Sequence, residues 1–155
     1  MTTDDVTRAL DEGGAEYELL PHAHTESALD EADALGVDPA EVGKTLVLCT
    51  PEGYIRAVIP ANCRIDLRKV RALVGGGKKH VHLATEEDLT RDYSEFDLGA
   101  VPPVGGTQNR VIVDRRLAER ESAVVEAGSH EQSVRISTAE LVRVARAEVV
   151  DICEN

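Results

Sequence analysis

Apolar residues recur along the chain in two spacings, and each spacing indicates a different element. Spacings of three and four residues, with glycine or a capping sequence at the ends, predict helices. The helices are expected over residues 4–13, 27–35, 66–74, a segment that follows 85–88, and 138 to about 146. Short apolar runs bounded by turn residues predict strands. The strands are expected over residues 17–20, 45–49, 54–59, 80–83, 111–113, 123–126, 133–136 and 148–152.

The order of these elements indicates the class of fold. Strands outnumber helices and often follow one another directly, which is typical of an α+β protein. The runs 45–49 and 54–59 are separated by Pro51-Glu52-Gly53, so we expect them to form a β-hairpin. We expect a mixed, partly closed β-sheet or barrel flanked by helices, with an ordered loop rich in glycine and proline over residues 95–109. Since no Pro/Ser-rich linker divides the chain, residues 1–155 are expected to form one domain.

The composition narrows the class of protein. Hydrophobic residues make up 42% of the 155 residues but aromatic residues only 3%, so the core is expected to be aliphatic. No apolar run approaches the roughly 20 residues that span a bilayer, and the first residues lack the features of a signal peptide. The three cysteines are odd in number and far apart, which argues against a disulfide framework or a zinc ribbon. We therefore expect no membrane association, and a reducing cytoplasm as the compartment.

Charge is distributed unevenly along the chain. The net charge is −12, and residues 1–43 hold twelve acidic residues against Arg8 alone. Residues 64–82 instead hold six basic residues against Asp66. A polyanion is attracted to such a basic segment and repelled by the acidic surface around it. The alternative is that these residues form an ordinary solvated face of the helix over 66–74.

Several short motifs are weak evidence for a functional site. The sequence Gly75-Gly76-Gly77-Lys78-Lys79 lacks the spacing of a phosphate-binding loop and follows a helix, so a flexible turn is expected. The pairs His22-x-His24 and His80-x-His82 could together hold a metal ion, but no cysteine or carboxylate has a helpful spacing, so no metal site is predicted. The sequence has no Gly-x-Ser-x-Gly motif of the kind that carries an acyl nucleophile. No cofactor is predicted.

Three segments are better candidates for a functional site. Lys44 opens the apolar run 45–49, where it can anchor an anionic ligand or simply extend its amino group to solvent. Residues 99–105 combine prolines, which fix the backbone, with glycines, which let it approach a ligand closely. This segment can equally be a stiff surface turn. His130 follows a Gly-Ser pair between two expected strands, and is either a site residue or an ordinary surface group.

Taken in order, these segments resemble the YbaK/prolyl-tRNA-synthetase-associated domain family, the trans-editing aminoacyl-tRNA deacylases. The resemblance extends from about Val6 to Ile152 and rests on the order of its pieces, each of which is weak alone. The pieces are Gly43-Lys44-Thr45-Leu46-Val47, Val58-Ile59-Pro60-Ala61, Asp66-Leu67-Arg68-Lys69, Leu83-Ala84-Thr85, Gly99-x-x-x-Pro103, Val111-Ile112-Val113-Asp114 and Ala127-Gly128-Ser129-His130.

The resemblance implies hydrolysis of the ester that joins a wrong amino acid to the 3′ adenosine of a tRNA. It implies that Lys44 holds the 3′ end and orients the ester, and that His130 contacts the amino group of the substrate or a water molecule. An aminoacyl ester is already activated, so a positioned water or the 2′-OH of the substrate suffices and no protein nucleophile is needed. The remaining residues expected to contact the substrate are Thr45, Gly99, Ala100, Val101, Pro103, Gly128 and Ser129.

The resemblance also suggests substrates and partners. Some alanyl-specific members carry an amide where this chain has Thr45, which keeps Cys-tRNA(Pro) beside Ala-tRNA(Pro) as the expected substrate. A prolyl-tRNA synthetase or another synthetase is the candidate protein partner, no DNA is expected to bind, and the chain is expected to be a monomer. Two alternatives stay open, a docking module of the same fold that has lost hydrolysis and a small-molecule esterase. The candidate contacts to the body of the tRNA are Arg68, Lys69, Lys78 and Lys79.

Overall fold

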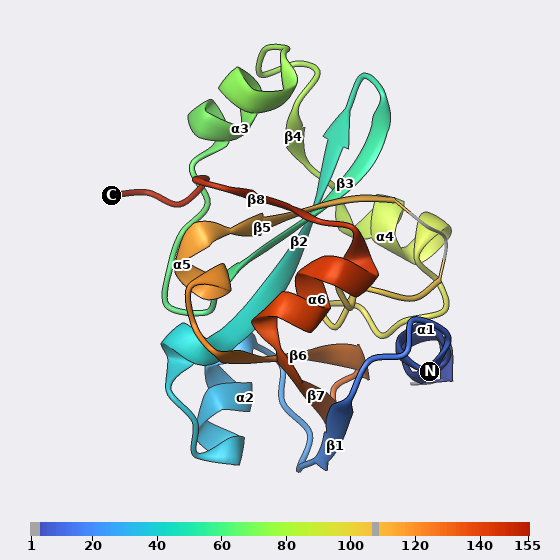
Figure 1. Ribbon diagram of the computed structural model, residues 1–155. Helices are drawn as coiled ribbons and strands as arrows, with labels where there is room; N and C mark the ends of the chain where they lie inside the picture. Colours follow the sequence, from blue (N-terminus) through green and yellow to red (C-terminus); the bar gives the residue numbers. More distant parts are fainter. Residues whose placement is uncertain (1–3, 107–108) are drawn as a thin grey trace.

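The computed structural model describes residues 4–106 and 109–155 (Figure 1). Its helices are α1 (Asp4–Glu12), α2 (Ala28–Leu35), α3 (Leu67–Val74), α4 (Glu86–Asp92), α5 (Arg115–Ala118) and α6 (Thr138–Ala145), with a 3-10 turn η1 at Pro39–Glu41. Its strands are β1 (Tyr17–Pro21), β2 (Val42–Thr50), β3 (Gly53–Pro60), β4 (His82–Leu83), β5 (Arg110–Asp114), β6 (Ser122–Ser129), β7 (Gln132–Ser137) and β8 (Glu148–Val150). Residues 107–108, which belong to the expected loop, and residues 1–3 lie outside the described ranges.

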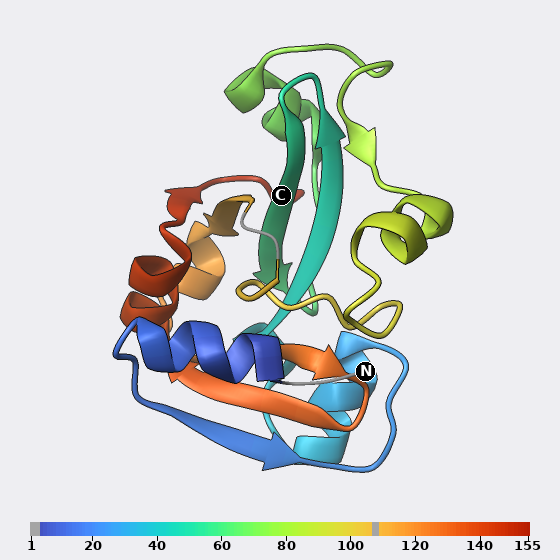
Figure 2. The same cartoon turned by 90° about the vertical axis from the view of Figure 1, so that its right-hand side faces the viewer.

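The strands form one mixed sheet in the order β1-β7-β6-β2-β3-β5-β8, with β4 paired to β2. The pairs β1/β7, β6/β7, β2/β3 and β2/β4 are antiparallel, whereas β2/β6, β3/β5 and β5/β8 are parallel. Figures 1 and 2 show the long β2–β3 hairpin crossing the part of the sheet that holds β6, β7 and β1. The expected α+β class, mixed sheet and hairpin are confirmed. Among the described strands the two ends of the sheet, β1 and β8, do not pair, so the barrel is not closed.

Strand β2 has two partners on one of its edges and a gap between them. It pairs with β6 only at Val42 and Gly43, and with β4 only at Leu48 and Cys49. Glycine is needed at position 43 because a Cβ there would lie 2.9 Å from the Leu117 side chain, too close for any larger residue. Within the described strands, residues 44–47 therefore pair with β3 alone, and the first residue of this stretch is Lys44.

The core is aliphatic, as the composition predicts, apart from buried Tyr93 and Phe96. One cluster joins valines of β2, β3, β5 and β6 to α1, α6 and the loop that follows α4. A second cluster lies under α3, and a third lies under α2 and includes Val42. The side chains of Lys44 and Val42 point to the same face of β2 because side chains alternate along a strand. Helix α2 covers that face at Val42, whereas Leu46 and Leu48, farther along the same face, pack in the cluster under α3.

Helix ends follow the local sequence. Asp66 caps α3 by accepting from Arg68 N at 2.9 Å, and Thr85 and Asp88 form the expected capping box of α4. Helix α2 begins after Ser27, whose side chain accepts from Asp30 N at 3.1 Å. Within the described ranges, no helix combines the length and apolar content needed to cross a bilayer.

Three sequence expectations need correction. The strand expected over 80–83 contains only His82 and Leu83, because the N–H groups of His80 and Val81 both bond to Gly77 O in a preceding turn. The last strand ends at residue 150 rather than 152. Helix α5 was not expected; it is a single turn that begins where the Asp114 side chain accepts from Arg116 N at 2.9 Å.

Candidate functional site

Two of the candidate segments meet in one cluster. Asp97, at the start of the Gly/Pro-rich loop, donates its N–H to Gly128 O at 3.0 Å, and its carboxylate accepts from His130 N at 3.2 Å. The His130 ring returns to the same loop, with Nε2 2.6 Å from Leu98 O. A Cβ at Gly99 would lie 3.5 Å from His130 Cε1. The exposed Gly99 backbone therefore lies directly against the imidazole of His130.

Backbone geometry explains this meeting. Gly99 and Gly128 have φ angles of 85° and 89°, values that L side chains rarely adopt. The pairing of β6 with β7 shifts register between Glu126 and Ser129, which marks a β-bulge just before His130. Bulges of this kind redirect the side chains that follow them, and here the bulge turns His130 toward the loop.

The other side of His130 is covered by the segment that leads into α2. Thr25 N donates to His130 O at 3.0 Å, and the rings of His24 and His130 lie 5.1 Å apart. The hydrogen bond from His24 to Glu26, at 2.6 Å, raises the pKa of His24. His130 is only 9% exposed, so the cluster holds its ring in a defined position.

Lys44 is related to this cluster only through the face of β2 that it shares with Val42. It lies on β2 opposite Ile59 and is half-buried, and its amino group makes no hydrogen bond or ion pair with any described residue. Helix α2 packs against that face at Val42, and the residues preceding α2 contact His130. The structure therefore brings Gly99, Gly128 and His130 into direct contact, and it places Lys44 on the neighbouring face without a described contact to them.

The remaining residues predicted to contact the substrate differ in burial and in hydrogen bonding. Thr45 lies on the opposite face of β2 from Lys44, and its buried Oγ1 has no hydrogen-bond partner among the described residues. Ala100, Val101 and Pro103 are buried, and Val101 packs in the same core cluster as Val47. Because Ala100 and Val101 are 0% and 4% exposed, they can contact a substrate only through their backbone. Ser129 is half-buried, and its Oγ accepts from Glu131 N at 3.1 Å.

The predicted tRNA contacts lie on and after α3. Figure 1 shows that α3 is at one end of the molecule and α2 at the other. Lys78 and Lys79 are exposed, and Arg68 is exposed beside Asp66, 3.6 Å away. Lys69 is instead engaged, since its amino group donates to the carboxylate of Asp151, the amide of Asn155 and a backbone carbonyl at Cys153.

The histidine pairs considered as metal ligands do not come together. In the described part of the chain no group of three or more His, Cys, Asp or Glu residues could hold a metal ion. His22 Nε2 lies 2.9 Å from Ser133 Oγ, and His82 Nδ1 lies 3.1 Å from the Leu83 carbonyl.

Sequence reasoning missed a buried acidic pair next to the His130 turn. Glu31 on α2 and Glu126 on β6 are 0% and 7% exposed, and Ser133 Oγ donates to Glu31. Burial raises the pKa of Glu31. Burial, together with the negative charge of Glu31, raises the pKa of Glu126 to about 9. Glu126 therefore carries a proton at neutral pH. The sequence signal was an acidic residue inside an apolar strand.

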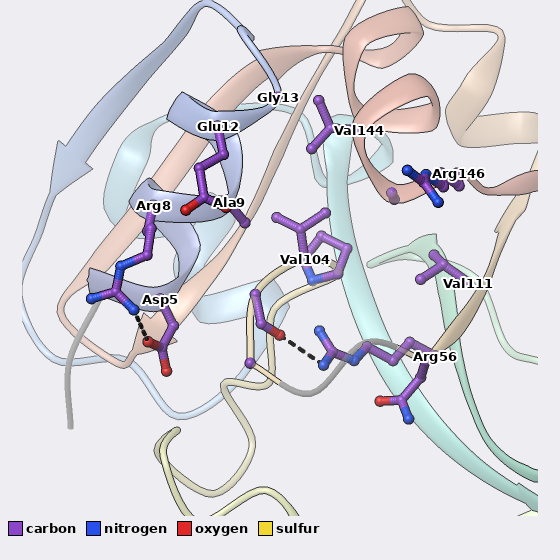
Figure 3. A pocket seen from close by; sticks show the side chains of 15 residues that line it. Asp5, Arg8, Ala9, Glu12, Gly13, Arg56, Val104, Val111, Val144 and Arg146 are labelled. Atoms are coloured by element: carbon purple, nitrogen blue, oxygen red, sulfur yellow. Dashed lines mark hydrogen bonds and ion pairs between the residues drawn. The ribbon is translucent and has the colours of Figure 1, made fainter.

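A second missed residue, Arg56, lines a separate pocket (Figure 3). This pocket of about 600 Å³ lies between α1, the far half of the Gly/Pro-rich loop, β5 and the end of α6. Of the residues predicted for the site from the sequence, only Pro103 lines it. The pocket and the His130 cluster therefore flank the same loop at different points along it.

Known proteins are similar to this chain in sequence and in fold. The sequence matches the family model of the aminoacyl-tRNA editing domain over residues 22–144. It is 24% identical over 158 residues to the multifunctional Ser/Thr-tRNA deacylase ProXp-y of Escherichia coli (strain K12), covering 97% of this chain and 92% of that protein. It is also 25% identical over 139 residues to a protein of Enterococcus faecalis named for Cys-tRNA(Pro)/Cys-tRNA(Cys) deacylation, covering 88% of this chain and 83% of that protein.

Two further matches connect the chain to prolyl-tRNA synthetases. The chain is 24% identical over 116 residues to the proline–tRNA ligase of Thermosipho melanesiensis, covering 75% of this chain but only 20% of the ligase. The chain thus matches about a fifth of the length of that ligase. Its fold matches a solved structure described as a trans-editing enzyme for prolyl tRNA synthetase, with a TM-score of 0.85, 29% identity and coverage of 99% and 97% of the two chains.

The matched region contains Lys44, the Gly/Pro-rich loop and His130, and it extends over most of the chain. The family resemblance seen in the sequence and the fold that it implied are confirmed. This chain belongs to the aminoacyl-tRNA editing domain family.

Proposed function

We propose that this chain hydrolyses the ester bond of mischarged tRNA, with its reaction centre where the Gly99 backbone meets the His130 ring. The contact between these two residues, inside the region matched by the editing-domain model, is the observation that carries the proposal. The deacylase names of the relatives that match nearly the whole chain support it.

The protonation of His130 suggests its role. A carbonyl oxygen only accepts hydrogen bonds, so the short contact with Leu98 O places the proton of the neutral ring on Nε2. Nδ1 is then free of a proton and can accept a hydrogen bond from the substrate ammonium group or from the attacking water. The water adds to the ester carbonyl carbon and gives up one proton, the bond to the ribose oxygen breaks, and that oxygen takes up a proton in turn, which leaves the free amino acid and the tRNA hydroxyl.

Two other groups complete the proposed centre. The N–H of Gly99 has no hydrogen-bond partner in the described part of the chain, so it can donate to the oxyanion that forms on the ester carbonyl. The ammonium group of Lys44 can bind the terminal phosphate or ribose of the tRNA, which fixes the ester relative to His130. No protein nucleophile is required in this scheme.

The amino acid that is removed should be small. We propose the Cys-tRNA(Pro) or Ala-tRNA(Pro) class, with Ser and Thr esters added because one relative is named for them. A hydrophobic pocket separates ligands that differ by one methylene by only about 1–3 kcal/mol. Selectivity among these esters is therefore expected to be graded rather than absolute.

Deacylation of a panel of charged tRNAs tests the function. The panel holds tRNA(Pro) charged with Ala, Cys, Ser or Pro, and tRNAs charged with Ser and Thr, each at low and at high KCl. Hydrolysis of a mischarged species and sparing of Pro-tRNA(Pro) is the expected result. A flat panel with folded protein would overturn the proposal and favour a docking module that acts beside a synthetase. Equal turnover of short aminoacyl esters without the tRNA body would favour a small-molecule esterase.

The basic segment after α3 is predicted to bind the body of the tRNA. Replacing Lys78 and Lys79 with glutamate is expected to raise the apparent Kd for charged tRNA, because two attractive charges become repulsive. The single-turnover rate at saturating tRNA is expected to stay the same, because Figure 1 shows α3 at the opposite end of the molecule from α2, and the segment before α2 contacts His130.

The matched control reverses the exposed Arg8 and Arg146, which lie on α1 and just after α6. The control changes the net charge equally, so a rise in Kd specific to the Lys78/Lys79 variant locates the contact. Equal effects in both variants, or none in either, would remove the basic segment from the binding surface.

A further inference from the structure

Arg56 is a charged residue in the middle of an apolar strand. It is 2% exposed and lies opposite Val47 in the β2–β3 hairpin. It shares a face of β3 with Val58, which packs in the same cluster as Val101 and Val104 of the Gly/Pro-rich loop. A fully buried guanidinium is costly unless its hydrogen bonds are satisfied, so its partners indicate its purpose.

Two of its hydrogen bonds go to backbone carbonyls of the Gly/Pro-rich loop, while its buried Nε has no hydrogen-bond partner among the described residues. Nη1 donates to Pro102 O at 3.0 Å, and Nη2 donates to Gly105 O at 2.8 Å. The guanidinium carbon lies 5.2 Å from the centroid of the Tyr93 ring, within the range of a cation–π contact. Figure 3 shows the guanidinium reaching from β3 to this loop at the edge of the pocket described above.

The sequence of the loop explains why a side chain supplies these bonds. Pro102 and Pro103 have no N–H, so this stretch cannot be held by a ladder of backbone hydrogen bonds. A planar guanidinium presents several donors in a fixed arrangement, and its charge strengthens each bond. One arginine therefore fixes two carbonyl groups three residues apart.

The loop is thus held at two places. Asp97 ties its near end to the His130 turn, as described above, and Arg56 ties its far end to β3. The backbone of Gly99, Ala100 and Val101 lies between these two anchors. A shift of the far anchor changes the position of this short stretch relative to His130, because the prolines leave the loop few internal degrees of freedom.

We propose that Arg56 is a positioning residue of the editing reaction, which holds the loop so that the Gly99 backbone keeps its place against His130. The expected effect of Arg56 on the reaction rate rests on the proposed function. Its expected effect on the position of the loop rests on the hydrogen bonds alone. Arg56 touches the loop on the side of Pro102 and Gly105, away from Gly99, so it acts through the backbone and not on the substrate.

The test compares Arg56→Met, which keeps a long apolar side chain but has no donors, with Arg56→Lys, which keeps one charged donor group. We expect the single-turnover rate at saturating mischarged tRNA to fall about tenfold or more in Arg56→Met, with a smaller fall in Arg56→Lys and an unchanged Kd for tRNA. The ratio of rates for mischarged tRNA and Pro-tRNA(Pro) is also expected to fall, because a looser loop discriminates less.

A matched control comes from Arg71, which also donates to a backbone carbonyl, at Val81 O, but at the α3 end of the molecule. Arg71→Met is expected to leave the saturating rate and the discrimination ratio unchanged. Equal losses in the two methionine variants, or a wild-type rate and ratio in folded Arg56→Met, would overturn the proposal. Arg56→Lys provides the same comparison if Arg56→Met does not fold.

Amide hydrogen exchange separates this proposal from the proposed function. Ala100 N donates to Asp97 O at 2.9 Å, so its exchange rate reports on the loop. Exchange at Ala100 is expected to accelerate in Arg56→Met and not in Arg71→Met, whether or not the protein deacylates tRNA. Unchanged exchange at Ala100 would show that Arg56 does not hold the loop, even in an active enzyme.

Discussion

Replacing Lys44 with alanine is expected to lower the single-turnover rate of deacylation about tenfold or more, which corresponds to about 1.4 kcal/mol or more of lost transition-state stabilisation. The melting temperature is expected to change little. The amino group of Lys44 bonds to no described residue, and the pairing of β2 with β3 uses only the backbone at this position. The loss should therefore fall on substrate binding and orientation.

Lys44→Met gives a matched comparison because it keeps the apolar length of the side chain and removes only the ammonium group. Both variants are expected to lose activity to a similar extent in the charged-tRNA assay, with thermal unfolding measured in parallel. A large fall in melting temperature in both variants would mean that Lys44 supports the fold, and would remove it from the proposed centre. Full activity would do the same.

The second large effect concerns the stability of the protein as a function of pH. The folded pKa of Glu126 is about 9, against an ordinary value of 4.5, because the group is buried beside Glu31. Between these two values the folded state binds a proton that the unfolded state does not. The free energy of unfolding is therefore expected to decrease with rising pH across this window, by up to about 1.4 kcal/mol per pH unit for one proton.

Glu126→Gln is expected to flatten this decrease and to stabilise the protein at pH 8. Glutamine removes the ionisable group and can still donate a hydrogen bond to Glu31. Glu31 then has no acidic partner, and the groups that remain near it are Ser133, His22 and His130. Urea unfolding at pH 5, 7 and 9 measures the effect as a change in the slope of stability against pH.

Glu140→Gln on α6 provides the contrast for Glu126→Gln. Its carboxylate is paired with Arg143, which lowers the pKa of Glu140, so its removal should not flatten the alkaline decrease. An unchanged slope in Glu126→Gln, with both variants folded, would show that the acidic pair does not control the alkaline stability.

Much of the fold could be predicted from the sequence because its signals are local. Asp66, Thr85 and Ser137 mark helix starts by capping chemistry, and the hairpin is marked by its own turn. The short strand at His82 was overestimated because an apolar run cannot reveal that Gly77 O captures the preceding N–H groups. The sequence could also not predict whether the sheet closes into a barrel, because closure depends on where β1 and β8 lie after the sheet bends.

The candidate site was predictable only in part, for the same reason. The family motifs named Gly99 and His130, which the structure brings together. The residues that hold them, Asp97 and Arg56, act through backbone carbonyls and amides far apart in the sequence. The spacing of residues in the sequence does not predict such a contact. A charged residue inside an apolar strand was the one visible sign, and it applied equally to Arg56 and Glu126.

The narrow connection between β2 and β6 divides the sheet into two structural halves. His130 belongs to the half made of β1, β7 and β6, and Lys44 belongs to the half built on β2 and β3. Among the described strands these halves are paired through Val42–Val124 and Gly43–Val125. A tRNA end bound by both Lys44 and His130 would therefore connect the two halves of the sheet. The proposed reaction centre is in this sense completed by its substrate, which joins two halves that strand pairing connects at only two described residue pairs.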